Sequence, residues 1–365
     1  MYIISGATGR IGSVVAGRLL DSGHPVRVIV RRPDAAANWT SRGAEAVVLD
    51  LRDSQKVTEA LKGATAFFAM MPFDLSVPDL DQYAAEVVQS VSSAVKGSGV
   101  RHTVMLSSGG ADLAEGTGPI LGLHHMEQAL AQTGTILTAL RPGHFQEKFG
   151  DVLGAVLHEG IFPVFASSAD TPLPMVATCD IAEIAVQELL TDTRSSETVD
   201  IVGPEYTERQ VARSLSDALG KLLEVVPIPE PDWMDALTEA GFTPHIAESL
   251  VDLYRADEQK RLGPRGNRSI RATTDIDTTV QQVLAQEACP SAPHIGSSSD
   301  DGDSAGRRPS LGVKSRKVLQ MFEGLVRTTG TQTVADSPRK VYHASQRVTV
   351  ALFVGDVVVQ DHVYV

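Results

Sequence analysis

Hydrophobic positions in the first 150 residues alternate between short continuous runs and spaced helical stripes. The continuous runs predict buried parallel strands, and the stripes predict helices that cover them. The expected strands are Tyr2–Ser5, Val26–Val30, Ala46–Leu49, Ala66–Met71, Thr103–Ser107 and Ile136–Arg141, and the expected helices include Gly12–Ser22, Gln55–Leu61 and Asp81–Lys96. This alternation predicts an α/β fold with a doubly wound parallel sheet in residues 1–150.

The sequence of residues 151–287 predicts a smaller C-terminal α/β region. Asp180 stands at the start of one amphipathic helix, and Thr207 is a suitable N-cap for another. We expect this region to pack over the edge of the sheet and to close a substrate pocket.

The composition changes after residue 287. Residues 288–310 are rich in Ser, Gly, Pro and Asp and predict a disordered linker. Residues 311–365 form a tail whose last apolar runs flank Gly355 and Asp356, which predicts a possible β-hairpin. Such a hairpin would pair with a sheet edge, serve oligomerisation, or have no selected structure.

The charge balance disfavours nucleic acid as a partner, because 32 basic against 45 acidic residues give a net charge of −13 over 365 residues. No apolar stretch reaches the roughly 18 residues that predict a membrane span. Met1 leads directly into the first strand, and the two cysteines, Cys179 and Cys289, show no metal-site or disulfide spacing. We therefore expect a cytoplasmic protein without a metal site, and the oligomeric state stays open.

A glycine-rich turn follows the first strand in the stretch IISGATGRIG. Gly6, Gly9 and Gly12 form G-x-x-G-x-x-G between a strand and an amphipathic helix. Glycine allows a positive φ and a close approach to a pyrophosphate, which the helix N-terminus attracts. The placement predicts a dinucleotide site of Rossmann type, and the alternative is an ordinary glycine-rich turn.

Arginine stands where an acidic residue would bind the ribose 2′-hydroxyl of NAD. Arg31 and Arg32 follow the second strand, and a guanidinium group favours a 2′-phosphate. The sequence thus favours NADP(H), unless the pair is simply a solvated surface feature. Asp50 and Leu51 would reach the adenine edge, although Asp50 could instead cap the helix that follows.

Seven stretches resemble the NmrA-like branch of the atypical short-chain dehydrogenases/reductases. They are GATGRIG, VRVIVRRP, VVLDLRD, VMLSSGGAD, GPILGLHHMEQALAQTG, LTALRPGHFQEKF and VDIVGPEYTERQVARSLSDALGK, in collinear order up to about residue 285. The resemblance implies a Rossmann sheet, a small substrate region and NADP(H) binding. The family includes reductases of quinones and other small molecules and redox-sensing regulators that catalyse nothing.

The expected cofactor site combines the glycine turn with the carboxyl ends of the strands. Its residues are Gly6, Thr8, Gly9, Arg10, Ile11, Gly12, Arg31, Arg32, Asp50, Leu51, Met71, Pro72, Ser107, Pro142 and Gly143. Pro142 and Gly143 would let the backbone lie against the nicotinamide carboxamide.

The usual catalytic pair of the short-chain reductases is absent, because none of the six tyrosines is followed by a lysine four residues later. The candidate catalytic residues are therefore His124 and His144 as proton donors and Ser108 as a hydrogen-bonding partner of a carbonyl oxygen. Ser107 would serve the same purpose, and Glu127 would share a helix face with His124. The alternative is that these histidines shape the pocket without exchanging protons.

The sequence favours an NADPH-dependent oxidoreductase that reduces a small conjugated or aromatic carbonyl compound, such as a quinone, by hydride transfer. Quinones suit a site without the usual acid, because the reduced oxygen is a stable phenolate. The alternatives are an NADP(H)-sensing regulator without catalysis and a structural protein whose tail mediates assembly.

Overall fold

The computed structural model of the chain describes residues 1–288. The strands are β1 Tyr2–Ile4, β2 Val26–Val30, β3 Glu45–Val48, β4 Ala66–Met70, β5 His102–Leu106, β6 Ile136–Pro142, β7 His144–Phe145, β8 Ile161–Val164, β9 Leu173–Val176, β10 Glu197–Val202, β11 Glu205–Tyr206, β12 Glu224–Pro227 and β13 Arg268–Arg271. The linker and the hairpin expected after residue 288 lie outside the described residues.

Eight strands form one parallel sheet in the order β13-β10-β6-β5-β4-β1-β2-β3. The order reverses beside β1, between β4 and β2, and a crevice for a ligand opens at such a point outside the carboxyl ends of the strands. The predicted doubly wound α/β fold is confirmed.

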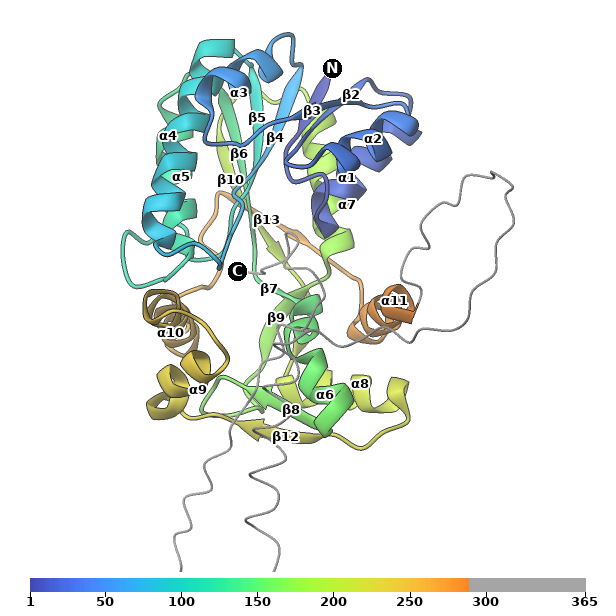
Figure 1. Ribbon diagram of the computed structural model, residues 1–365, viewed down its shortest axis with the longest axis vertical. Helices are drawn as coiled ribbons and strands as arrows, with labels where there is room; N and C mark the ends of the chain where they lie inside the picture. Colours follow the sequence, from blue (N-terminus) through green and yellow to red (C-terminus); the bar gives the residue numbers. More distant parts are fainter. Residues whose placement is uncertain (289–365) are drawn as a thin grey trace, which may run out of the picture. The chain divides into compact units, whose positions relative to one another are not determined.

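Helices cover both faces of this sheet (Figure 1). The α-helices are α1 Arg10–Asp21, α2 Pro33–Ser41, α3 Ser54–Leu61, α4 Leu80–Ser98, α5 Ile120–Ala131, α6 Leu153–Glu159, α7 Thr178–Leu190, α8 Glu208–Leu219, α9 Trp233–Glu239, α10 Pro244–Glu258 and α11 Ile276–Ala288. One apolar core lies between the sheet and α1, α2 and α7, and a second lies between the sheet and α3, α4 and α5. The helices therefore hold the strand ends, and with them the site, from both sides.

The large sheet continues beyond residue 150, which the sequence pattern did not indicate. β10 pairs with β6, with Asp200 opposite Arg141, and β13 then pairs with β10. β13 has alternating rather than continuous burial, because it is an edge strand, and its four residues lack the apolar run that identifies a buried strand.

Past the carboxyl ends of the large sheet, β7 continues from β6, and the backbone N of Met175 in β9 donates to the carbonyl of Pro204, just after β10. β11, β9 and β7 form a small sheet, and β12 pairs with β8. Thr207 caps α8 in a capping box with Gln210, as its sequence predicts, and Asp180 lies in the first turn of α7. Among the described residues, no helix combines the length and the apolar character that a membrane crossing requires.

Candidate functional site

The glycine turn connects β1 to α1. Gly6 has a φ of 65°, in the left-handed region. A Cβ atom at Gly12 would lie 2.2 Å from the carbonyl oxygen of Gly6, so only glycine fits there. Gly9 is the N-cap of α1, which therefore begins at Arg10, two residues before the expected start, and no side chain caps the helix. This is the geometry in which a helix N-terminus binds a phosphate.

Of the two arginines after β2, one lies at the cavity beside the glycine turn. Arg31 lines this cavity, and its Nη1 lies 3.9 Å from Oδ2 of Asp74. Arg32 pairs with Asp34 at 3.4 Å and is absent from the cavity wall. Arg31 is therefore the arginine placed to contact a 2′-phosphate.

Asp50 is held at the end of β3 by Arg52. Arg52 donates hydrogen bonds from its backbone N at 2.9 Å and from Nη2 at 2.7 Å to the two carboxylate oxygens. These hydrogen bonds keep the pKa of Asp50 below its ordinary value, although burial opposes them. Asp53, rather than Asp50, caps α3 by accepting a hydrogen bond from the backbone N of Lys56. Asp50 thus remains an ionised acceptor at the cavity.

The cavity beside the glycine turn, named here the cofactor cavity, has a volume of about 120 Å³. The predicted residues that line it are Gly6, Thr8, Gly9, Arg10, Ile11, Arg31, Asp50, Leu51, Met71, Pro72 and Ser107. Gly12 packs behind the turn instead, and Pro142 and Gly143 line a neighbouring cavity. The sequence missed Tyr83 and Phe145, because Tyr83 belongs to a helical stripe typical of core residues.

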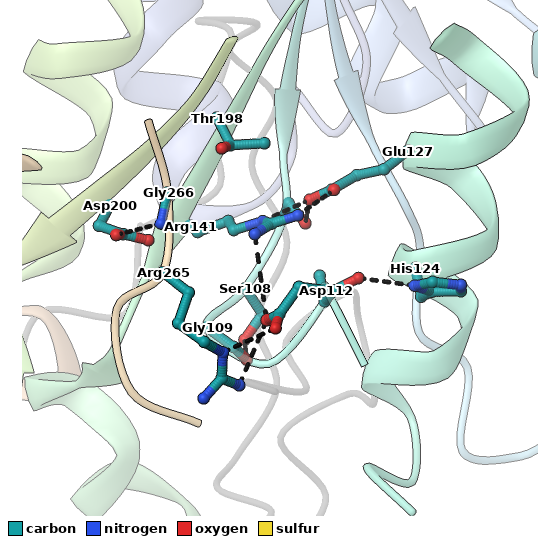
Figure 2. A network of polar contacts seen from close by, with 12 residues as sticks. Ser108, Gly109, Asp112, His124, Glu127, Arg141, Thr198, Asp200, Arg265 and Gly266 are labelled. Carbon is teal, nitrogen blue, oxygen red and sulfur yellow. Dashed lines mark hydrogen bonds and ion pairs between the residues drawn. The ribbon is translucent and has the colours of Figure 1, made fainter. Parts of the chain in front are cut away.

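A buried ion pair joins Glu127 and Arg141 (Figure 2). Glu127 on α5 and Arg141 on β6 are 5% and 8% exposed, and two hydrogen bonds join the guanidinium to the carboxylate. Ser107 donates a hydrogen bond from Oγ to Oε1 of Glu127 at 2.5 Å. Arg141 also approaches Asp112, with 4.0 Å from Nη1 to Oδ1.

The hydroxyl groups of the two serines after β5 both donate hydrogen bonds within the protein. A carboxylate only accepts hydrogen bonds, so the Ser107 proton points to Glu127. Ser108 donates its proton to the backbone carbonyl of Gly109 at 3.1 Å. In this arrangement both serines present oxygen lone pairs to the cavities, which suits an amide N–H better than a carbonyl oxygen.

A second cavity of about 300 Å³, named here the substrate cavity, adjoins the cofactor cavity, and Phe145 lines both. Ser108 and His144 lie in its wall, as do Tyr254 and Asp257 of α10. Nε2 of His144 is 2.8 Å from Oδ1 of Asp257. Burial raises the pKa of Asp257, but the charge and hydrogen bond of His144 outweigh this effect, and the pKa lies below its ordinary value.

His124 lies away from both cavities. Its Nδ1 is 2.8 Å from the backbone carbonyl oxygen of Ala111 (Figure 2). The ring of His125 packs against the His124 ring edge to face. Glu127, three residues later on the same helix, accepts hydrogen bonds from Arg141. Of the two predicted histidines, the structure brings only His144 to a cavity.

Residues 260–266, named here the strap, cross the loop that follows β5. Arg265 forms two hydrogen bonds with Asp112, at 2.6 and 3.3 Å, and Arg261 donates to the carbonyl oxygens of residues 115 and 116. A Cβ atom at Gly109 would lie 2.4 Å from the carbonyl oxygen of Leu262, so glycine permits this close crossing. The strap thereby completes the wall of the substrate cavity.

The sequence matches the NmrA-like family over residues 2–288. The chain belongs to this family. The resemblance noted in the sequence is therefore confirmed, as is its extent, because the match ends where the composition changes.

Two characterised relatives of this NmrA-like chain are named as reductases. It is 30% identical over 292 residues to the (4-alkanoyl-5-oxo-2,5-dihydrofuran-3-yl)methyl phosphate reductase of Streptomyces griseus, a match that covers 80% of this chain and 95% of the relative. It is 28% identical over 257 residues to an NAD(P)H azoreductase of Xenophilus azovorans, covering 70% of this chain and 86% of the relative.

The fold of the NmrA-like chain is also that of a solved oxidoreductase. An NADPH-dependent quinone oxidoreductase from Escherichia coli, crystallised with NADPH, superposes with a TM-score of 0.63 at 24% identity. The superposition covers 78% of this chain and all of that one. The cofactor bound in that structure is the one that the arginine after β2 indicates for this chain.

Proposed function

We propose that this protein is an NADPH-dependent oxidoreductase that reduces a small conjugated or aromatic carbonyl compound, such as a quinone. The observation that carries the proposal is the junction of the two cavities at Phe145. One cavity is lined by the glycine turn and by Arg31, and the other has an aromatic and apolar wall with the His144–Asp257 pair. A cofactor and an acceptor would therefore meet at this junction.

The glycine turn fits the pyrophosphate of NADP(H) by shape and by charge. Gly12 leaves room for the backbone crossing, and the uncapped N-terminus of α1 attracts an anion. When bound, NADPH supplies a hydride to the acceptor. The protein binds the dinucleotide, orients its nicotinamide and excludes water around it.

Ser107 is suited to orienting the nicotinamide. Because the Ser107 hydroxyl donates its hydrogen bond to Glu127, Oγ of Ser107 would accept a hydrogen bond from the carboxamide N–H₂ group. Arg141 compensates the buried charge of Glu127, so this orientation of Ser107 is retained in the apolar strand end.

His144 is the best-placed proton donor for a reduced oxygen. The Asp257 carboxylate accepts a hydrogen bond from Nε2 of His144 and so orients the imidazole ring in the wall of the substrate cavity. A quinone needs this proton less than an isolated ketone does, since its reduced oxygen is stable as a phenolate. The absence of Tyr-x-x-x-Lys is therefore compatible with quinone reduction.

The named relatives support the same class of reaction. An azoreductase, a reductase of an oxo-dihydrofuran phosphate and a quinone oxidoreductase act on conjugated small molecules.

The proposal is tested by NADPH oxidation with quinones, enones and azo dyes, using two substitutions of Gly9. Gly9 has the φ of −86° and ψ of 169° of an ordinary N-cap, a backbone conformation that aspartate and serine also adopt and in which both favour the helix. Gly9→Asp should abolish NADPH binding, because its carboxylate repels the pyrophosphate, whereas Gly9→Ser should retain most of it.

The same assay separates an enzyme from a regulator that only senses NADP(H). Tight NADPH binding, lost in Gly9→Asp, without turnover of any acceptor would contradict the enzyme and favour the sensor. Sustained turnover that Gly9→Asp abolishes, with an unchanged unfolding temperature, is the result we expect.

A further inference from the structure

The wall of the substrate cavity contains two lysines that the proposed reaction does not use. Lys148, which follows β7, is half-buried, and its Nζ lies 5.2 Å from the centroid of the Tyr254 ring. Within residues 1–288 this ammonium forms neither a hydrogen bond nor an ion pair. Lys260, the first residue of the strap, is exposed and also lines the cavity.

Among residues 1–288, no nearby carboxylate forms an ion pair with either lysine ammonium group. Asp257 is engaged by His144 at 2.8 Å. Asp257, Glu208 and Asp151 act on Lys148 only as charges at longer range. The remaining acid in the wall, Glu205, is exposed to solvent.

The backbone at Lys260 shows that this lysine occupies a position that favours glycine. Its φ is 55°, and among residues 1–288 no other residue except glycine has a positive φ. The backbone N of Lys260 donates to the carbonyl of Asp257, and that of Arg261 donates to the carbonyl of Ala256. This pair of hydrogen bonds is the Schellman motif that ends α10, with Lys260 at its left-handed residue.

Other helices of this chain end in the same motif with glycine at that residue. The same two hydrogen bonds and a positive φ occur at Gly23 after α1, Gly43 after α2, Gly220 after α8 and Gly241 after α9. Glycine adopts this conformation without the steric cost that a side chain incurs. The exception is the helix end that lines the substrate cavity, which is where a lysine side chain has a use.

We propose that Lys148 and Lys260 form a subsite for an anionic substituent of the substrate, a carboxylate, sulfonate or phosphate group. This inference rests on the proposed function, because it describes the acceptor that the same cavity takes. An ammonium is a compact point charge with three donors, so it binds any of these groups without a fixed geometry. The conjugated part of the acceptor then lies toward Phe145, where the cavities meet.

The subsite is tested with naphthoquinone and naphthoquinone sulfonate, at saturating NADPH. We compare the wild-type protein with Lys148→Met, Lys260→Gly and Lys96→Met, the last a control on an exposed lysine of α4 away from both cavities. The ratio of kcat/KM for the sulfonate to that for the neutral quinone should fall about tenfold in each cavity variant and stay constant in the control. Inorganic sulfate should compete with the sulfonated quinone more strongly than with the neutral one.

Lys260→Gly excludes a merely structural explanation. Glycine suits a φ of 55°, so this variant should unfold at the same or a higher temperature while it loses the preference for the anion. An unchanged ratio in both cavity variants would overturn the subsite.

A binding measurement keeps the two proposals distinct. The dissociation constant of naphthoquinone sulfonate is measured by calorimetry with the protein saturated with NADP⁺. Absent turnover with binding weakened in the cavity variants would reject the proposed reaction and support the subsite. Turnover whose acceptor preference ignores both lysines would reject the subsite alone.

Discussion

At the residue scale, the hydrogen bonds that a side chain already makes within the protein limit what it can offer a ligand. Ser107 donates a hydrogen bond to Glu127, and Ser108 donates one to a backbone carbonyl. Asp50 accepts a hydrogen bond from Arg52. Each commitment restricts what the residue can offer a ligand. The serines are thereby acceptors, and the side-chain donors left in the wall of the substrate cavity are His144, Tyr254 and the two lysines.

At the scale of one residue, we expect Arg31 to set the cofactor preference, because it lines the cofactor cavity. Arg31→Asp should weaken NADPH binding at least tenfold relative to NADH binding, since it replaces a charge-assisted contact with repulsion of the 2′-phosphate. Titration of both cofactors measures the effect. Arg32→Asp is the matched control, because Arg32 pairs with Asp34 outside the cavity. An equal loss of both cofactors in Arg31→Asp would refute the assignment.

At the scale of elements, the ends of α1 and α10 and the strap shape the two cavities. Gly9 begins α1, a Schellman motif ends α10, and the strap continues from that end across the loop after β5. The strap is tied by Arg265 and Asp112. Because Arg265 is 40% exposed, solvent screens this pair, and its contribution is about 0.5–1 kcal/mol.

The Arg265–Asp112 pair makes part of the stability dependent on pH. Burial raises the pKa of Asp112. The hydrogen bond and the charge of Arg265 contribute to a larger effect in the opposite direction, so the folded pKa lies below the ordinary value of 3.8. The pair therefore stabilises the fold above that value, and its contribution is lost as the pH falls through the folded pKa. Asp112→Asn should lower the free energy of unfolding at pH 7, and the difference from wild type should vanish in acid.

Urea unfolding at several pH values measures this difference. Asp192→Asn, which removes an exposed partner of Arg101, should leave the free energy of unfolding unchanged at every pH. A deficit of Asp112→Asn that persists undiminished below the folded pKa would show that the ion pair is not its cause.

The whole molecule assembles the site from distant parts of the chain. His144 lies in β7, directly after β6, and Asp257 lies in α10, 113 residues later, yet the two side chains meet in the wall of the substrate cavity. The cofactor cavity belongs to the sheet and its turn, and the substrate cavity forms only where the later helices pack against it.

Proton donation is tested at this scale by two histidine variants. His144→Gln should lower kcat about 10-fold to 100-fold for an azo or enone acceptor, and less for a quinone, with KM changed little. Asp257→Asn should cause a smaller loss, because it orients rather than donates. His124→Gln should have no effect, since His124 lines neither cavity. Loss of activity in His124→Gln but not in His144→Gln would reverse the assignment.

Much of the cofactor cavity was predictable, because its signals are local. The turn of Gly6, Gly9 and Gly12 and the arginine after β2 lie within the first 31 residues, and short-range sterics and charge determine what they do. The parallel sheet was predictable for the same reason, since continuous apolar runs identify its buried strands. Edge strand β13 escaped prediction because its burial alternates.

The sequence by itself therefore determined the fold class, the phosphate turn and the arginine beside it. Only the tertiary structure decided that Ser107 donates to Glu127, that His144 rather than His124 reaches a cavity, and that Lys148 and Lys260 share one wall. The physical reason is the distance along the sequence over which each interaction acts. A turn is specified by the sterics of adjacent residues, whereas these partners are far apart in sequence and meet only when the helices and strands pack.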